Sequence, residues 1–581
     1  MKILLLHSED SPLAGPWTGE RWDVVYDLGR SGWPACERWS RAFGCPVKPI
    51  DGLRDGLAEI QKVRELLQLG LGRLVDREGL DWWELTAILV HDQLETVVVL
   101  RKLANGLPDD AEVWITRDGF HANALRQLLG ARLHVIPSPA VRSRNGVAHY
   151  VNRLRQLPAA QVVQILGDKF DVRYRLRRHL HGRSDRSSAP VVLVPSSYVN
   201  VSLMANAFAQ TTPASEFLLV STRSSGRLKK VAGNVRQEWL ASYVDHSGLE
   251  ELPELLRRWE ALKQEINLVP EFAALAHLGY VDDFPRRFAD GLAIRDAWLG
   301  VLKREPVFAV LCCDDSNPHL HIALLLAQKR GLPSMACHHG ALDGRYLIKT
   351  CHADVLLAKG RMEADYLVNT CGVDASVVEI GAPVSAPRRE KTRVDKGDWI
   401  VFFSEPYELI AERAEEIYRD ILPGLVDLAA RTGKKLIVKL HPSENLSARQ
   451  SLAEMLLPKG QAGAIEWVTG QLNPELLRRM WFGVTVQSSV VVECAVLGFP
   501  CFLCEWLDMW PYGYVAQYRK FGVGIGLVSP NDIAQIPEKL AAWRPSKQVA
   551  DDCWQTLEQG RFEDMLAGKT ATPSPLGMQR S

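Results

Sequence analysis

The sequence predicts an α/β protein with two doubly wound domains that face each other across a cleft. Its 581 residues are more than a single hydrophobic core accommodates. Short apolar runs alternate along most of the chain with longer stretches of helical periodicity, which is the pattern of parallel strands joined by crossover helices. One charged stretch without periodicity, residues 387–398, divides this alternation into two halves and is typical of a linker.

Four segments follow from this division. We expect a first domain with helical insertions over 1–384, a linker over 385–398, a second domain over 399–545, and a terminal segment over 546–581 that holds one helix and a disordered tail.

The elements of the first half are predicted from their apolar patterns. A buried strand at 3–6 opens the chain, residues 10–41 are rich in Trp, Gly and Pro and typical of a loop, and Asp81 is expected to cap a helix. Further strands are predicted at 113–116, 133–136, 191–194, 217–220, 307–313, 335–337, 355–357 and 377–380. Helices are predicted at 53–74, 91–103, 121–129, 196–209, over most of 249–302, and at 319–329.

In the second half, strands are expected near residues 400, 436, 465, 484, 501 and 525, with a terminal helix at 551–565. The apolar run 436–438 ends at Lys439, Leu440 and the dipeptide His441-Pro442. Because Pro442 cannot continue a strand ladder, the chain turns there and leaves His441 at the carboxyl end of the strand. Open α/β sheets bind ligands at this edge.

A second turn carries hydroxyl groups. The run 484–486 ends at Gln487, Ser488 and Ser489, and an apolar stretch then leads to Gly498, a natural end for a helix. A serine at the helix start leaves backbone N–H groups facing outward, and such a helix start binds phosphate. We expect this turn and the His441 turn to lie at neighbouring strand ends and to form one anion-binding crevice.

Two charged residues complete this candidate donor site. Glu493 lies about one helical turn after Ser489. We expect its carboxylate to accept hydrogen bonds from ribose hydroxyls and Lys439 to offset phosphate charge, although a surface residue and a lysine that points away are the structural alternatives.

The first half places polar side chains after two apolar runs. Asp314, Asp315 and Asn317 follow the run 307–313, and His338 and His339, with Asp343 close by, follow the run 335–337. Burying so many polar groups as plain structure is costly. An imidazole near neutral pKa can take a proton from a hydroxyl group, and a nearby carboxylate orients it. We therefore expect at least one of these groups to act chemically.

Composition excludes some classes of protein. Lys and Arg together number 69, as do Asp and Glu, and this balance argues against general nucleic-acid coating. No apolar run approaches the roughly 20 residues of a membrane-spanning helix, and the cysteine spacings indicate a reduced, cytoplasmic protein. A basic stretch at 172–186 is either a solvated helix end or a contact to an anionic acceptor or to the inner face of a membrane.

The stretches AQKRGLPSMACHHGALDGRY (327–346), KLHPSEN (439–445) and QSSVVVECAVLGFPCFLCEWLDMWPYGY (487–514) resemble bacterial surface-polysaccharide transferases with the GT-B fold, which consists of two Rossmann-like domains. The comparison extends to capsule polysaccharide synthesis proteins and CDP-glycerol glycerophosphotransferases and covers roughly residues 307–525. In those enzymes a His-Gly turn holds the proposed base, which implies His339 here. The resemblance also implies donor-phosphate contacts from His441, Ser488 and Ser489.

This chain departs from the glycerophosphotransferases at two places. It has Cys337-His338-His339-Gly340-Ala341 where they usually have an aromatic residue, a single His, and Thr-Pro after the Gly. It also has Val486-Gln487 where they carry Asp-Tyr before Ser-Ser. These departures favour sugar transfer over polymer-type glycerol phosphate transfer.

We therefore expect a glycosyltransferase that moves a sugar from a CMP-, UDP- or CDP-linked donor to a glycan or lipid-linked acceptor. His339, His338, Asp314 and Asp315 are the candidate catalytic residues. Because no Asp-x-Asp motif follows a strand in the expected place, we expect no metal, and no cofactor is expected either. A glycerophosphotransferase, a nucleotide-sugar 2-epimerase and a non-catalytic nucleotide or glycan binder remain the alternatives.

Overall fold

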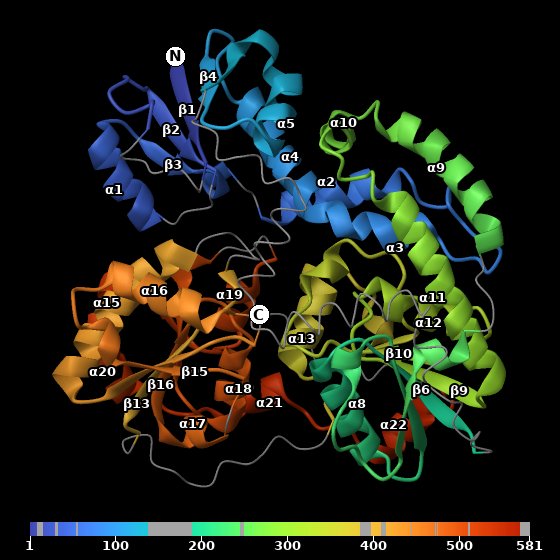
Figure 1. The fold of residues 1–581 in the computed structure, drawn as a ribbon. Coiled ribbons are helices and arrows are strands. Elements are labelled where there is room, and N and C mark those ends of the chain that lie inside the picture. The colour runs from blue at the N-terminus through green and yellow to red at the C-terminus, as the bar shows by residue number, and fades with distance from the viewer. Residues whose placement is uncertain are drawn as a thin grey trace.

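Three separate parallel sheets, each covered by helices, make up the computed structural model (Figure 1). The model describes residues 1–7, 15–28, 33–53, 56–136, 189–244, 249–383, 397–407, 414–442, 444–470, 472, 474–508 and 512–569. Every strand pair within the three sheets is parallel. This topology confirms the predicted α/β class with doubly wound sheets.

The first sheet has the order β3-β2-β1-β4-β5. Its strands are β1 Lys2–Leu6, β2 Val24–Asp27, β3 Val47–Pro49, β4 Glu112–Ile115 and β5 Leu133–Val135. Its covering helices are α1 Trp33–Phe43, α4 His91–Asn105 and α5 Phe120–Leu129. The prediction of a loop over residues 10–41 is wrong, because β2 and α1 lie there. Four buried residues are enough to add β2 beside β1, and this pairing is not visible in local composition.

The second sheet lies at the lower right of Figure 1 and has the order β12-β11-β10-β9-β6-β7-β8. Its strands are β6 Val191–Ser196, β7 Glu216–Ser221, β8 Val235–Trp239, β9 Val307–Cys312, β10 Ser334–Ala336, β11 Val355–Ala358 and β12 Val378–Ile380. Its main helices are α8 Val199–Thr211, α12 Pro318–Gln328 and α13 Arg361–Asp365. Residues 1–384, expected from sequence to form one domain, thus contain two sheets.

A helical layer connects these two sheets. It consists of α2 Leu57–Gln68, α3 Trp82–Ala87, α9 Leu252–Ile266, α10 Pro270–His277 and α11 Phe284–Arg304. Asp81 caps α3 by accepting a hydrogen bond from the Trp83 backbone N–H, as predicted. The fully buried Arg295 of α11 pairs with Asp76, 2.8 Å away, and this buried ion pair fixes α11 against the segment that leads into α3.

The third sheet has the order β15-β14-β13-β16-β17-β18, and all six of its strands lie where the sequence predicts them. They are β13 Trp399–Phe403, β14 Lys435–Lys439, β15 Ile465–Val468, β16 Met480–Thr485, β17 Cys501–Cys504 and β18 Ile525–Leu527. The helices are α15 Ala414–Thr432, α16 Leu446–Leu456, α17 Pro474–Arg479, α18 Val490–Leu497, α19 Tyr514–Lys520 and α20 Ile536–Ala542.

The last described helices return from the third sheet to the second. Two helices, α21 Lys547–Cys553 and α22 Gln559–Leu566, replace the single predicted helix at 551–565. The two helices are separate because Thr556, which lies between them in the chain, pairs with Ala382 in a parallel β-bridge. In Figure 1 α22 lies beside α8, where the rings of Phe208 and Phe562 pack 5.3 Å apart.

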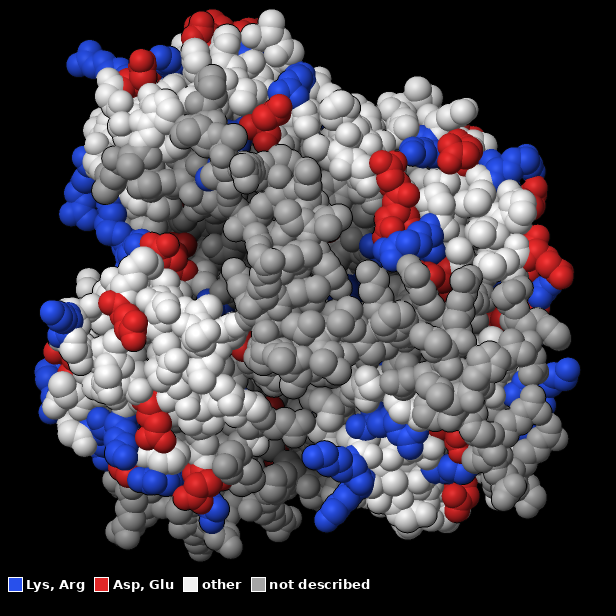
Figure 2. All heavy atoms as spheres, in the orientation of Figure 1, with Lys and Arg blue, Asp and Glu red and all other residues white. Residues whose placement is uncertain are grey.

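Three sequence-based predictions fall outside the described residues: the basic stretch 172–186, most of the linker 385–398, and the disordered tail from 570. No helix in the described part of the chain is both long and apolar enough to cross a lipid bilayer. On the face shown in Figure 2, basic and acidic side chains of the described residues are interspersed rather than gathered by sign.

Candidate active site

A cavity of about 300 Å³ lies between the second and third sheets, and we call it the cleft cavity. One wall comes from the second sheet, with His339 and Gly340 after β10 and Lys359 after β11. The opposite wall is the face of α18 that carries Ser489 and Glu493. The remaining lining residues are Met204, Ala341, Val492, Val496, Leu497 and Trp554. The structure thus brings the predicted base and the predicted donor helix to one place.

His339 belongs to a hydrogen-bonded cluster with Tyr198 and Asp314. The Tyr198 hydroxyl donates a hydrogen bond to the Asp314 carboxylate. Since that proton is committed, the phenolic oxygen is left as an acceptor for a ring N–H group of His339, whose Nδ1 and Nε2 lie 3.1 and 3.3 Å away. The other ring nitrogen of the neutral imidazole carries a lone pair. The imidazole can therefore accept a proton at that nitrogen.

The surroundings keep this imidazole neutral. Burial lowers the pKa of His339 below its ordinary value of 6.5, Asp314 opposes this, and the Lys359 cation lowers the pKa further. Burial and the Asp314 charge also raise the pKa of Tyr198, so its hydroxyl keeps its proton. The Lys359 ammonium is held by the His338 carbonyl oxygen at 2.8 Å and by Glu363.

The opposite wall has the features expected of a phosphate site. α18 begins after Ser489, whose side chain makes no capping hydrogen bond, and ends at Gly498 in the left-handed conformation, with φ 71°. The positive end of this helix and the Ser489 hydroxyl thus face the cavity. Desolvation raises the pKa of the Glu493 carboxyl one turn further on, although the side chain reaches solvent at the cavity mouth.

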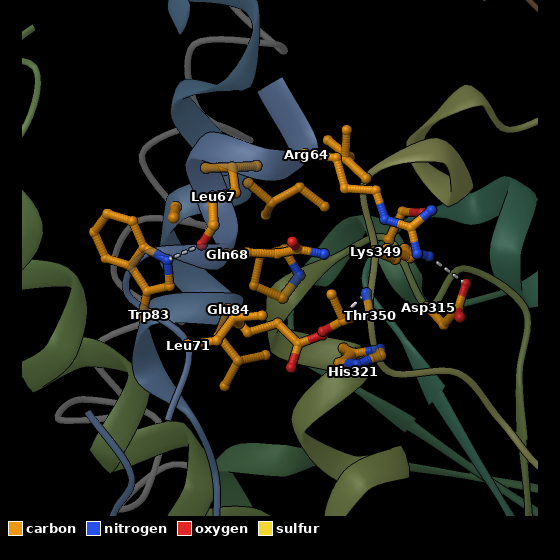
Figure 3. A pocket seen from close by; sticks show the side chains of 16 residues that line it. Arg64, Leu67, Gln68, Leu71, Trp83, Glu84, Asp315, His321, Lys349 and Thr350 are labelled. Atoms are coloured by element: carbon orange, nitrogen blue, oxygen red, sulfur yellow. Dashed lines mark hydrogen bonds and ion pairs between the residues drawn. The ribbon is translucent and has the colours of Figure 1, made fainter. Parts of the chain in front are cut away.

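The two aspartates after β9 point to different surroundings. Asp314 contacts Tyr198 in the cluster, whereas Asp315 accepts hydrogen bonds from Lys349 at 2.8 Å and from Tyr346 at 2.7 Å. Figure 3 shows the Asp315–Lys349 pair at the wall of a different, smaller cavity of about 40 Å³. Burial acts to raise the pKa of Asp315, but Lys349 holds it below the ordinary value. Asp315 is thus engaged in structure, and Asp314 is the aspartate that can assist His339.

His338, Asn317 and Asp343 support the loops. The His338 ring packs 4.4 Å from the His339 ring, and burial holds its pKa well below 6.5. Asn317 caps α12 by accepting a hydrogen bond from the His319 backbone N–H. Asp343 accepts a hydrogen bond from the Ser316 hydroxyl, and this contact joins the loops after β9 and β10. Asp343 also pairs with Arg345 at 3.1 Å.

The prediction that the His441 and Ser488–Ser489 turns lie at neighbouring strand ends is wrong. His441 follows β14 as expected, but β13 lies between β14 and β16 in the sheet. Because β13 lies between them, β14 and β16 are separated by about twice the 4.8 Å spacing of neighbouring strands. His441 is exposed, and the cleft cavity is lined by other residues. Its role in donor binding stays a prediction.

Two buried carboxylates occupy the space at the end of β13. Glu405 accepts hydrogen bonds from the Gln487 backbone N–H at 3.1 Å and from the Thr485 hydroxyl at 3.2 Å. Glu444 accepts from the His441 backbone N–H at 2.7 Å and from the Ser404 hydroxyl at 2.8 Å. Desolvation raises the pKa of Glu405 to about 7, with the Glu444 charge acting in the same direction. Carboxyl groups, rather than a phosphate, therefore fill the predicted crevice between the two turns.

Lys439 is also committed elsewhere. Its ammonium group donates to the backbone carbonyl oxygens of Leu440 and Gly470, each at 2.6 Å. Both bonds hold the end of β14 against the end of β15. We therefore leave Lys439 out of the proposed donor site.

Several groups at the site were not predicted. Tyr198, Lys359 and Glu405 follow the ends of β6, β11 and β13. The rule that identified His339, namely polar residues directly after an apolar strand, applies to all three positions. Trp554 reaches the cavity only because the chain returns to the second sheet, and no local signal indicates this.

One group of side chains has the spacing of metal ligands. Among the described residues, ligand atoms of Asp314, His338 and His339 all lie within 4.8 Å of one another. The cations of Lys359 and Arg345 lie close enough to lower the pKa of both histidines. The same positive charges oppose a metal cation, so the residues present fit a hydrogen-bonded acid–base cluster better than a metal site.

No family model and no curated protein matches this chain. Solved structures do match at low similarity. The UDP-GlcNAc 2-epimerase of Methanocaldococcus jannaschii is 11% identical with a TM-score of 0.42 and covers 65% of this chain and 99% of its own. MurG of Acinetobacter baumannii is 13% identical with a TM-score of 0.37, covering 65% and 99%. The wall teichoic acid polymerase TagF is 12% identical with a TM-score of 0.34, covering 72% and 98%. At these values the matches say nothing about the activity of this chain.

Proposed function

We propose that this protein is a glycosyltransferase that moves a sugar from a nucleotide-sugar donor to an acceptor hydroxyl group without a metal ion. One observation carries the proposal. The cleft cavity holds the His339 imidazole on one wall and the start of α18 with Ser489 on the other. A base for the acceptor and a site for the leaving phosphate therefore face each other across a space of about 300 Å³.

The proposed reaction uses these groups as follows. The donor phosphate binds at the start of α18, where the helix dipole and the Ser489 hydroxyl stabilise negative charge, and Glu493 accepts hydrogen bonds from the ribose. The unprotonated ring nitrogen of His339 takes the proton from the acceptor hydroxyl group, while the oxygen of that hydroxyl group forms a bond to the anomeric carbon of the sugar. The bond from that carbon to the phosphate oxygen breaks, and its electron pair leaves with the nucleotide.

The Asp314–Tyr198 pair acts on His339 rather than on the substrate. When His339 gains a proton, Asp314 stabilises the imidazolium charge through the shared Tyr198 hydroxyl. In Tyr198→Phe the ring packing against His339 is kept but the hydrogen bond is lost. We expect the turnover rate to fall by about tenfold or more, with donor affinity unchanged.

Donor binding is tested by substitutions at Ser489. Asp is as good as Ser at a helix start, so Ser489→Asp keeps α18 stable while it places a negative charge where the phosphate binds. We expect calorimetry with UDP, CMP and CDP to identify one nucleotide that binds the wild type and is weakened at least about tenfold in Ser489→Asp. His441→Ala is titrated alongside: His441 lies at the end of β14, outside the cleft cavity, and only a loss of nucleotide affinity in this variant would support its predicted role in donor binding.

Activity is then assayed with sugars linked to the nucleotide that binds. Sugar transfer requires nucleotide release that depends on an acceptor and is lost in His339→Ala. Conversion of the donor sugar without any acceptor would instead indicate a 2-epimerase, and turnover of CDP-glycerol alone would indicate a glycerophosphotransferase. Nucleotide binding with no turnover, and no effect of Ser489→Asp on it, would refute the proposal.

A further inference from the structure

A second cavity, of about 530 Å³, adjoins the Tyr198–Asp314–His339 cluster. Tyr198 and Asp314 line it directly, and its outer walls come from α3 and α11. Four guanidinium groups reach it, and we call it the arginine cavity. They are Arg223, Arg286, Arg287 and Arg345. The cluster that contains the proposed base therefore lines the cleft cavity through His339 and the arginine cavity through Tyr198 and Asp314. Four arginines and two carboxylates, Asp290 and Asp314, line the arginine cavity, so basic groups are in excess there.

Three of these arginines already have carboxylate partners. Arg286 and Arg287 both pair with Asp283, at 2.6 and 3.3 Å, and Arg345 pairs with Asp343. Arg223 differs from them. Within the part of the chain that the structure describes, no carboxylate pairs with Arg223, and its buried Nε group has no hydrogen-bond partner. A buried cationic donor without a partner is costly, and such groups mark places where a ligand completes the hydrogen bonds.

The neighbouring histidine reports the same positive field. Burial, together with the charges of Arg223 and Arg287, lowers the pKa of His319 to about 3. His319 is therefore neutral, and its Nδ1 has no hydrogen-bond partner. Arg223 and His319 thus bring buried nitrogens without hydrogen-bond partners to one part of the cavity, and Arg287 adds a positive charge there. A guanidinium fork with a second cation beside it matches the oxygens of a phosphate group.

We propose that the arginine cavity binds a phosphate group of the acceptor, with Arg223 and Arg287 as its main contacts. This inference rests on the proposed transferase function and names the class of acceptor: a phosphorylated sugar or a phosphate-linked glycan. A volume of about 530 Å³ accommodates a sugar with its phosphate. With the phosphate at Arg223, the acceptor extends along Tyr198 and Asp314 and presents its hydroxyl group to His339.

Pyrophosphate is a suitable probe because its binding can be measured without a donor and without turnover. Since it can also bind at the start of α18, the titrations use the Ser489→Asp background, in which a negative charge closes that site. Calorimetry compares this background with the same protein carrying Arg223→Gln, Arg287→Gln or Arg257→Gln. Arg257 lies on α9, is exposed, and pairs with Glu254 at 2.7 Å, so its substitution removes one positive charge away from the cavity.

We expect one pyrophosphate to bind, with the affinity reduced at least about tenfold by Arg223→Gln and by Arg287→Gln and unchanged by Arg257→Gln. Arg287 is exposed, so its variant also serves if Arg223→Gln fails to fold. Absence of binding in the background protein, or equal losses in all three variants, would overturn the proposal. The outcome is separate from the transferase test, because loss of nucleotide binding in Ser489→Asp leaves pyrophosphate binding at Arg223 unaffected.

Discussion

Replacing Glu405 by Gln tests the electrostatics of the donor turn most directly. Glu405 is 8% exposed, and desolvation raises its pKa from 4.5 to about 7 in the folded protein. A difference of about 2.5 pKa units corresponds to roughly 3 kcal/mol between the two protonation states. The Gln amide oxygen can accept the same hydrogen bonds from the Gln487 backbone and the Thr485 hydroxyl.

The direction of the pH effect follows from the pH at which the folded and the unfolded chain each release the proton of Glu405. Below pH 4.5 the carboxyl is protonated in both the folded and the unfolded chain. Between pH 4.5 and about 7 the unfolded chain has lost the proton while the folded protein keeps it, so the free energy of unfolding falls as the pH rises. Glu405→Gln removes this loss. We expect the variant to match the wild type near pH 4.5 and to exceed it by up to about 3 kcal/mol above pH 7.5.

Melting temperatures of both proteins, measured from pH 5 to 8, check this expectation. Because all other titrating groups are shared, the difference between the two curves isolates Glu405. The difference should grow by several degrees across the range. Glu454→Gln makes the same chemical change at an exposed position of α16 and serves as the control. A Glu405→Gln difference that changes no more with pH than the Glu454→Gln difference would refute the assignment of a raised pKa to Glu405.

Three further outcomes follow from the site. Lys359→Met combined with Glu363→Gln removes a cation that lowers the pKa of His339. The pKa of His339 should therefore rise, and the acid limb of the pH–rate profile should move to higher pH. An acid limb that does not move would exclude His339 as the titrating base. EDTA should leave activity unchanged, and a loss restored by Mn²⁺ or Zn²⁺ would instead assign a metal to this cluster. In Gly360→Ala the new Cβ would lie 2.3 Å from the Asp552 carbonyl oxygen, whereas the Cβ in Gly233→Ala would meet open space. The melting temperature of Gly360→Ala should therefore be a few degrees lower than that of Gly233→Ala.

The third sheet shows how much local pattern can predict. Most of its six strands contain a short apolar run that ends at a polar turn, as in a sheet covered on both faces, and each strand lies where the pattern indicates. β8 is not predicted, for the opposite reason. β8 reads VRQEW and is only partly buried, so its membership in the sheet depends on pairing with β7 rather than on its own composition.

The order of strands is the information that the sequence lacks. His441 and Ser489 both follow buried strands, which the pattern shows, but whether those strands are adjacent depends on contacts between distant residues. The choice between Asp314 and Asp315 is similar. Successive side chains leave a strand end in different directions, and only the positions of Tyr198 and Lys349 decide which aspartate reaches the base.

The cluster around His339 also explains why two adjacent histidines need not share a role. His338 is held beside His339, but its own charge is suppressed by burial, by the neighbouring imidazole and by Lys359. Only His339 has a hydroxyl–carboxylate pair that can stabilise the imidazolium formed when it takes a proton. If His338 were the base, Tyr198→Phe would leave the turnover rate intact and His338→Asn would abolish it. Because Asp314 reaches His339 through Tyr198, we expect the reverse order of effects, and comparing turnover rates in these two variants decides which imidazole takes the proton.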